Sequence, residues 1–216
     1  MEHSRNRPWV VFDLGEVLTD SPTHLAELAA LMGVAEPDFA PAYWKHRRAY
    51  DEGGPGSAYW RAIGQDIGVD VSDALVTQLI EVDSHAWTTL HPDSLPLLHD
   101  VKATGSGLAL LSNIPVELAA RVRTRSWSEL FDLLVFSCDV GAMKPQPEIY
   151  RAVEEGIANL EQTPPAPSSL TFFDDRAENV AAAIEAGWRA RVWAGHADAR
   201  LFQTSASSGC SAKAAS

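Results

Sequence analysis

The stretch that most constrains this chain is Trp9 to Thr19, where a carboxylate directly follows a short apolar run. The run Trp-Val-Val-Phe is bounded and β-branched, which is typical of a strand buried on both faces of a parallel sheet. Asp13 ends the run, and burying an ionised carboxylate is costly unless it is paired or bound to a metal. Ligands of open α/β sheets bind at the carboxyl edge of the strands. The pattern predicts either a functional Asp13 at that edge or an aspartate that caps the next helix, with Gly15 making the turn.

Composition limits the protein class and its partners. The chain has 216 residues, of which 46% are hydrophobic and 21% charged, as in a globular protein with one or two domains. The net charge of -12 argues against nucleic acid and anionic membranes as partners, so an anionic substrate would need local positive charge or a metal. Cys138 and Cys210 lie outside any metal-binding spacing, and the apolar run after the polar start is too short for a signal or membrane segment. We therefore expect a reduced, cytoplasmic protein.

Residues 20–88 carry helical patterns and no strand pattern. Helices are expected at 24–32, 41–51 and 58–67, and from Ser72 onward. A segment of this length is too long for a loop, so it is predicted to be an inserted helical subdomain, or cap. Its basic run, Lys45 to Arg48, is interpreted as a solvated helix face in preference to a patch that reaches a substrate.

Strands and helices alternate after residue 88. Strands are expected at 108–111, 133–136 and 170–173, with a last core strand at 190–193; helices are expected at 94–103 and 116–123, from Pro147, and around Val180. The inward faces of the last two helices should be Ile149, Val153, Ile157 and Leu160, then Val180, Ala183, Ile184 and Gly187. This order predicts a doubly wound, mostly parallel α/β core of residues 1–19 and 89–204, with the cap at 20–88. Residues 205–216 have too little apolar content to pack and are expected to be disordered.

Polar side chains are expected where several of these strands end. They are Asp13, then Ser112 and Asn113, then Asp174 and Asp175, with Lys144 following a fourth strand. Parallel strands present their carboxyl ends at one edge, so three carboxylates would meet there and each pair would repel by about 4 kcal/mol at about 4 Å and an effective dielectric of about 20. Such a site holds protons or recruits cations, and carboxylates suit a hard cation, Mg²⁺ first. Mg²⁺ and Lys144 together would balance the three negative charges.

This set of groups suits phosphoryl chemistry. A carboxylate beside Mg²⁺ and a lysine can attack phosphorus as a nucleophile. Mg²⁺ and Lys144 would absorb charge on the phosphoryl oxygens, and the Ser112 hydroxyl with the backbone N–H groups after it would hold another oxygen. Taken one at a time, each group is better explained as a strand-end cap or a surface lysine, so the prediction depends on their meeting.

Four segments together resemble the four motifs of the haloacid dehalogenase (HAD) superfamily. In chain order they are Phe-Asp-Leu-Gly-Glu-Val-Leu, Leu-Leu-Ser-Asn, Gly-Ala-Met-Lys-Pro-Gln-Pro-Glu-Ile-Tyr and Phe-Phe-Asp-Asp-Arg-Ala-Glu-Asn-Val. Their order and spacing match, and residues 20–88 stand where that superfamily places its C1 helical cap. The Asp-Leu-Gly of the first motif is similar to that of bacterial sugar-1-phosphate phosphatases.

The resemblance implies a role for each matched residue. Asp13 would be the nucleophile, forming an aspartyl-phosphate that water hydrolyses. Ser112 and Asn113 would bind the substrate phosphate, and Lys144 would steady both the nucleophile and the phosphate. The activity implied is a Mg²⁺-dependent hydrolysis of small organic phosphate monoesters, with sugar phosphates among the candidates. The partner is then a small phosphorylated metabolite, and we expect a monomer or a homodimer.

The resemblance also implies the metal ligands. At Gly15, however, this sequence departs from the superfamily's first motif. Mg²⁺ would be held by Asp13, the carbonyl oxygen of Gly15, Asp174 and Asp175, with Asp175 favoured as a direct ligand. Most phosphatases of the superfamily carry a second Asp where Gly15 stands, and it protonates the leaving group, a contribution worth roughly 10²–10⁴-fold in rate. Glu16, His46 and Glu52 are possible replacements for this acid, and each of them is disfavoured. Two alternatives stay open: a metal-free haloacid dehalogenase that uses the same Asp13, and an inactive binding protein of this fold.

Overall fold

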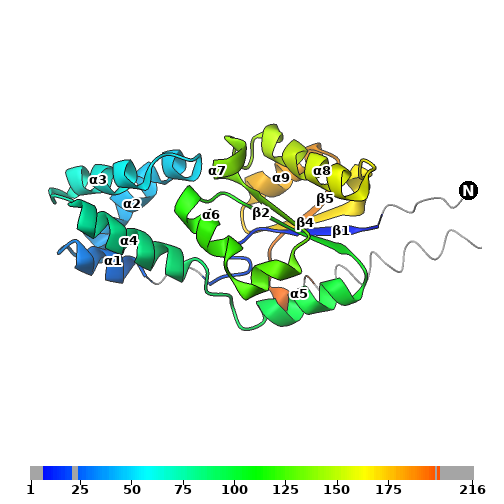
Figure 1. Cartoon of the computed structure of the whole chain (residues 1–216), viewed down its shortest axis with the longest axis horizontal. Coiled ribbons are helices and arrows are strands. Elements are labelled where there is room, and N and C mark those ends of the chain that lie inside the picture. Colours follow the sequence, from blue (N-terminus) through cyan, green and yellow to red (C-terminus); the bar gives the residue numbers. More distant parts are fainter. Residues whose placement is uncertain (1–6, 21–23, 198, 200–216) are drawn as a thin grey trace, which may run out of the picture.

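The computed structural model describes residues 7–20, 24–197 and 199, and its centre is a five-stranded parallel sheet (Figure 1). The strands are β1 (Trp9–Phe12), β2 (Gly107–Ser112), β3 (Leu133–Phe136), β4 (Leu170–Asp174) and β5 (Arg189–Val192). Their order is β3-β2-β1-β4-β5, and each neighbouring pair runs parallel. β1 is therefore central, and Asp13 leaves the sheet at the middle of its carboxyl edge. The predicted doubly wound α/β class is confirmed.

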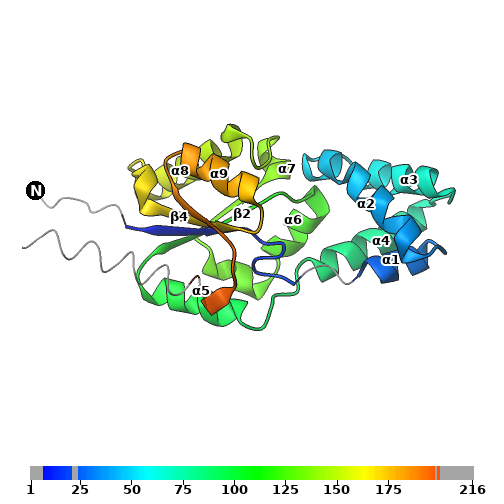
Figure 2. The same cartoon turned by 180° about the vertical axis from the view of Figure 1, so that it is seen from behind.

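Helices cover both faces of this sheet (Figures 1 and 2). α5 (Ser94–Ala103) and α6 (Val116–Arg123) lie on one face, and α8 (Pro147–Glu161) and α9 (Ala177–Glu185) lie on the other; α7 (Ser137–Val140) follows β3, and 3₁₀ turns span Ser126–Leu130 and Pro167–Ser169. β1 contributes side chains to the hydrophobic cores on both faces of the sheet. Val10 and Phe12 pack against α5 and α6, and Trp9 and Val11 pack against α8 and α9. Burial on both faces explains why this strand is continuously apolar.

The cap is a bundle of four helices beyond the carboxyl edge of the sheet (Figure 1). Its helices are α1 (Leu25–Leu31), α2 (Glu36–Asp51), α3 (Gly56–Ile67) and α4 (Asp73–Ala86). They share a hydrophobic core of their own, centred on Phe39, Tyr43, Trp60 and Leu79. The inserted helical cap is thus part of the confirmed fold class. An antiparallel bridge between Thr19 and Leu90 joins the two connections to the rest of the chain.

Three local expectations were wrong. The second cap helix begins at Glu36 and not at Pro41, because Pro37 sets its first turn and the buried Phe39 ties that turn to the cap core. Two of the expected inward faces were partly wrong: Leu160 and Ile184 face solvent, with exposed fractions of 53% and 55%, and Gly187 is exposed beyond the end of α9, with a φ of 88°. The last strand is Arg189–Val192, one residue earlier than expected, and it is an edge strand whose side chains are half-buried or exposed.

Three remaining expectations concern membrane segments, the C-terminal tail and the domain boundaries. Among the described residues, no helix is both long enough and apolar enough to cross a membrane. The tail expected at 205–216 lies outside the described residues. The boundaries proposed between core and cap stay predictions.

Candidate active site

Lys144 joins two of the expected carboxylates at the carboxyl edge of the sheet. Its Nζ lies 2.8 Å from Asp13 Oδ1 and 2.7 Å from Asp174 Oδ2, and it also donates to the carbonyl oxygen of Leu111 at 3.0 Å. The lysine is 3% exposed. Burial works against its charge, but the two carboxylates outweigh burial and raise the pKa of Lys144. The ammonium is therefore held charged between strands β1, β2 and β4.

Asp174 is fully engaged by hydrogen bonds. Its Oδ1 accepts from the backbone N–H of Arg176 and from Asn179 Nδ2, both at 2.9 Å, while Oδ2 accepts from Lys144. Its neighbour Asp175 is half-buried and lines the pocket beside it. Asp174 thus has the more rigid position, and Asp175 the more open one.

Three carboxylates converge where a cation was expected. Oxygen atoms of Asp13, Asp174 and Asp175 lie within 4.8 Å of one another. Burial raises the pKa of Asp13 to about 6 against the opposing charge of Lys144, with Asp174 adding to the rise. Burial and the charges of Asp13 and Asp174 raise the pKa of Asp175 to about 7. A set of hard oxygen donors that repel one another fits a divalent cation such as Mg²⁺.

Ser112 and Asn113 lie at the same edge but make different contacts. Ser112 ends β2, is buried and lines the pocket. Asn113 uses its whole amide on the backbone of Lys144, because Oδ1 accepts the Lys144 N–H at 2.8 Å and Nδ2 donates to the Lys144 carbonyl at 3.0 Å. The Asn113 side chain therefore fixes the loop that carries the lysine.

Gly15 lines the pocket, and a cap tryptophan covers it. A Cβ atom at position 15 would lie 3.0 Å from the six-membered ring of Trp87, the residue that follows α4. Trp87 is itself held by a hydrogen bond from its Nε1 to the hydroxyl of Tyr43 at 3.1 Å. The space that a second aspartate would use is thus taken by an indole ring.

The pocket has a volume of about 370 Å³ and is closed on one side by the cap. The cap residues that line it are Trp44, Arg47, Asp51 and Trp87. Arg47 divides the basic run, because it is buried and faces the pocket while Lys45 and Arg48 are exposed. The expectation of a solvated face is therefore right for Lys45 and Arg48 and wrong for Arg47.

Sequence reasoning missed a buried polar network behind this wall. Arg47 donates through Nε to Asp51 Oδ1 at 2.8 Å and through Nη1 to Asp83 Oδ2 at 3.1 Å. The Tyr43 hydroxyl donates to Asp83 Oδ1 at 2.7 Å. The available signal was the four-residue spacing of Tyr43, Arg47 and Asp51, which puts all three on the inward face of α2.

The comparison with protein families decides what kind of protein this is. A family model described as haloacid dehalogenase-like hydrolase matches residues 8–187. This chain belongs to that family. The matched range holds all four expected motifs and the cap between the first and second.

A curated protein and a solved structure resemble this chain over different extents. The chain is 30% identical to Phosphatase MT3486 of Mycobacterium tuberculosis (strain CDC 1551 / Oshkosh) over 115 residues, 52% of this chain and 50% of that protein, so the match spans about half of that curated relative. A HAD-family enzyme of Bacteroides thetaiotaomicron superposes with a TM-score of 0.70 at 21% identity, covering 92% of this chain and 99% of that one. The same enzyme was crystallised with magnesium and inorganic phosphate.

Another solved structure that this chain resembles is L-2-haloacid dehalogenase from Xanthobacter autotrophicus with chloropropionic acid covalently bound. It superposes with a TM-score of 0.67 at 18% identity and covers 85% of this chain and 76% of that chain. At these identities the solved structures show a shared fold alone. The choice between phosphatase and dehalogenase therefore depends on the residues of this chain.

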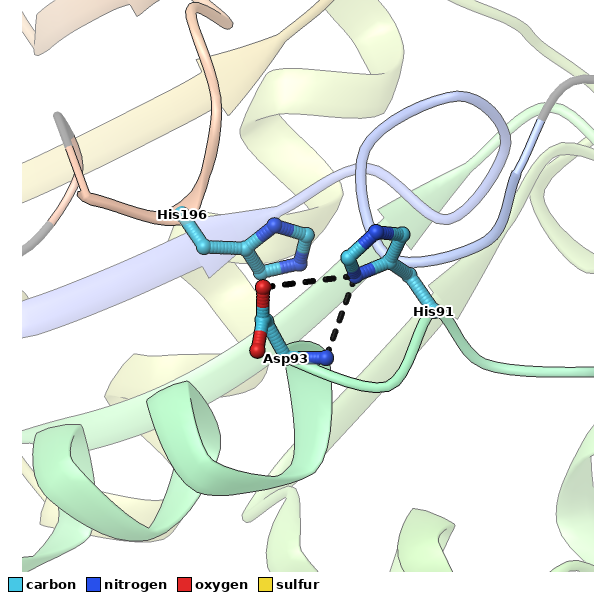
Figure 3. A group of neighbouring side chains, drawn as sticks. All are labelled: His91, Asp93 and His196. Carbon is cyan, nitrogen blue, oxygen red and sulfur yellow. Dashed lines mark hydrogen bonds and ion pairs between the residues drawn. The ribbon is translucent and has the colours of Figure 1, made fainter.

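A second group of possible ligands lies outside the pocket, at the connection between cap and core. His91, Asp93 and His196 approach one another there, with stacked imidazole rings 4.5 Å apart (Figure 3). His91 Nδ1 accepts a hydrogen bond from the backbone N–H of Asp93 at 3.1 Å, and His196 Nε2 lies 2.8 Å from Ser94 Oγ. One ligand atom of each of the three residues lies within 4.8 Å of the others, but His91 Nδ1 and His196 Nε2 already make these contacts, so we assign no metal to this group.

Proposed function

We propose that this chain is a Mg²⁺-dependent phosphatase that acts on small organic phosphate monoesters. The observation that supports it is the convergence of three carboxylates, Asp13, Asp174 and Asp175, two of which are paired with the buried Lys144 that lines the pocket. A pocket of about 370 Å³ suits a metabolite-sized ligand, for which sugar phosphates are candidates. The magnesium and phosphate bound to the Bacteroides enzyme and the name of the mycobacterial phosphatase agree with this choice.

In the proposed reaction the chain's own residues divide the work. An oxygen of Asp13 attacks the phosphorus atom and forms an aspartyl-phosphate, which water then hydrolyses. Lys144, fixed by Asp174 and the backbone of Leu111, aligns Asp13 and offers positive charge to a phosphoryl oxygen. The hydroxyl of Ser112 binds a second oxygen. When bound, Mg²⁺ would be held by Asp13, the Gly15 carbonyl, Asp174 and Asp175, and it would offset the negative charge of the phosphate.

The dehalogenase is the second candidate, and the observation that favours it is Gly15. A halide leaves without a proton, so a dehalogenase needs no acid where Gly15 stands. Against it stand the three converging carboxylates, because a carbon–halogen substrate would gain nothing from a cation beside Asp13. We therefore prefer the phosphatase.

A single set of assays separates these candidates. We expect the full chain to hydrolyse p-nitrophenyl phosphate with Mg²⁺, and both EDTA and Asp13→Asn to abolish turnover. Halide release from 2-chloropropionate should not occur. Turnover that survives EDTA or Asp13→Asn would disprove the proposed mechanism, and halide release without metal would establish the dehalogenase. Phosphate-analogue binding without turnover would indicate an inactive protein of this fold.

A further inference from the structure

The cap places a carboxylic acid in the same pocket as Asp13. Asp51 is the last residue of α2, is 7% exposed, and lines the pocket together with Asp13 and Lys144. The core offers no side chain at Gly15, the position from which an acid would otherwise reach the substrate. Asp51 from the cap and Gly15 from the core therefore line the same pocket.

Asp51 is held in place from two sides. Arg47 donates through Nε to its Oδ1 at 2.8 Å, and Arg47 is fixed in turn by Asp83 at 3.1 Å. The backbone carbonyl of Asp51 accepts a hydrogen bond from Ser137 Oγ, which belongs to α7 of the core. The carboxyl group is thus positioned relative to the core as well as within the cap.

The surroundings of Asp51 allow it to be both protonated and charged near neutral pH. Burial raises the pKa of Asp51 to about 7, Arg47 acts against the rise, and the charges of Asp83 and Asp13 add to it. Arg47 faces it from its own helix, Asp83 from α4 and Asp13 from the core. The effect of Asp13 also means that the two carboxyl groups lie within electrostatic reach of each other. A group that first gives and then takes a proton works best with a pKa near the working pH.

We propose that Asp51 is the general acid and base of the phosphatase reaction, in place of the side chain that Gly15 lacks. The inference rests on the proposed function. In the first step Asp13 bonds to phosphorus, the bond from phosphorus to the leaving oxygen breaks, and that oxygen takes its proton from Asp51. In the second step the Asp51 carboxylate takes a proton from water as the water oxygen bonds to phosphorus. The bond from phosphorus to Asp13 breaks, and inorganic phosphate and protonated Asp51 result.

The other acidic or basic candidates are placed less well. His46 Nε2 is bonded to Asp66 at 2.7 Å, and Glu52 is bonded to Arg48 at 3.1 Å. Neither His46 nor Glu52 is among the residues that line the pocket. Glu16 does line it, from the side of Asp175, whose pKa it raises. Glu16 is therefore the competitor that an experiment must separate from Asp51.

Leaving-group dependence tests the proposal. An acid is needed for an alkyl phosphate, whose alkoxide leaves poorly, but not for 2,4-dinitrophenyl phosphate. With glycerol 2-phosphate we expect Asp51→Asn to lower kcat/KM by about 10²-fold or more, and with the dinitrophenyl ester by less than about threefold, because kcat/KM reports the steps up to release of the leaving group. The wild-type decline of kcat/KM above about pH 7 on glycerol 2-phosphate should vanish in the variant. Glu52→Gln, one residue away and outside the pocket, should leave both substrates unaffected.

The ratio of the two substrates keeps the test valid if the variant is partly unfolded, because unfolding lowers both rates equally. An equal loss of kcat/KM on both substrates, or no loss on either, would overturn the role of Asp51. If Glu16→Gln selectively lost activity on glycerol 2-phosphate and Asp51→Asn did not, Glu16 would be the general acid and base. If wild-type protein hydrolyses neither ester, the proposed function fails and not merely this inference.

Discussion

At the scale of single residues, Gly15 and Trp87 show how a missing side chain is matched by a larger neighbour. The sequence predicts that position 15 lacks an acid, but it gives no sign of what fills the space. The structure shows the Trp87 ring within 3.0 Å of where a Cβ would stand. Trp87 comes from the end of α4, more than seventy positions along the chain, so only the packing of cap on core reveals the pair.

This pair predicts that an aspartate cannot simply be put back. We expect Gly15→Asp to lower the free energy of unfolding by about 1–3 kcal/mol, because the Trp87 ring must move. In a Trp87→Leu background, where the ring is gone, the same change should cost less. Urea unfolding of the four proteins gives the coupling energy. A coupling near zero would contradict the contact.

At the scale of elements, regular strands and helices were predictable and their exceptions were not. The continuous apolar run of β1 and the start of α8 at Pro147 follow from local sequence alone. The start of α2 does not, because Pro41 is tolerated inside a helix whose first turn is fixed by the burial of Phe39. Likewise β5 looked like a core strand, but its place at the sheet edge is set by topology.

The inward face of α2 carries a buried charged residue, Arg47, which the sequence pattern did not predict. Its ion pairs make the stability of the protein depend on pH. Arg47 lies between two buried carboxylates, Asp51 and Asp83. Despite burial, Arg47 with His24 and Tyr43 keeps the pKa of Asp83 below its ordinary 3.8, so Asp83 stabilises the fold above that pH and less so as pH falls. Without Arg47, burial would raise the pKa values of both Asp51 and Asp83. The protein would then lose stability as the pH rises through these raised pKa values, because each buried carboxyl group would have to ionise.

We therefore expect Arg47→Met to cost about 3–5 kcal/mol at pH 8 and clearly less at pH 5. Asp51 already contributes in the same direction in the wild type, since its pKa of about 7 means that its contribution fades as pH rises toward neutrality. Urea unfolding at both pH values measures the difference. The matched control is Arg48→Met, one residue away and exposed, which should change stability by less than about 0.5 kcal/mol at either pH. A cost for Arg47→Met that does not depend on pH would contradict the argument.

At the scale of the whole molecule, the pocket has one half that the sequence could predict and one that it could not. The ends of parallel strands must meet at one edge, so Asp13, Ser112 and Asp174 were expected together. Asp13 and Ser112 line the pocket, and Asp174 is joined to Asp13 through the buried Lys144. The cap half depends on how a separate bundle sits on the core, which no local pattern encodes. That is why Asp51 was absent from the expected site residues.

Ser137 of the core contacts Asp51 of the cap, so a substitution at Ser137 tests how the cap is held on the core. This buried α7 residue accepts the backbone N–H of Ile114 at 2.9 Å and donates to the carbonyl of Asp51. We expect Ser137→Ala to lower the free energy of unfolding by about 1–3 kcal/mol, because buried polar groups lose their partner. We also expect faster hydrogen exchange at the carboxyl end of α2, since the cap would open more often.

A serine inside the core provides the comparison that isolates this effect. Ser128 is also buried, and its hydroxyl donates to the backbone carbonyl of Arg125 at 2.7 Å, both within the core. Ser128→Ala should lower the free energy of unfolding by a similar amount. Hydrogen exchange in α2 should then rise no more than exchange in the rest of the protein. If both variants accelerate exchange in α2 equally, the contact of Ser137 with Asp51 does not hold the cap, and the carboxyl group would lose one of its two positional restraints.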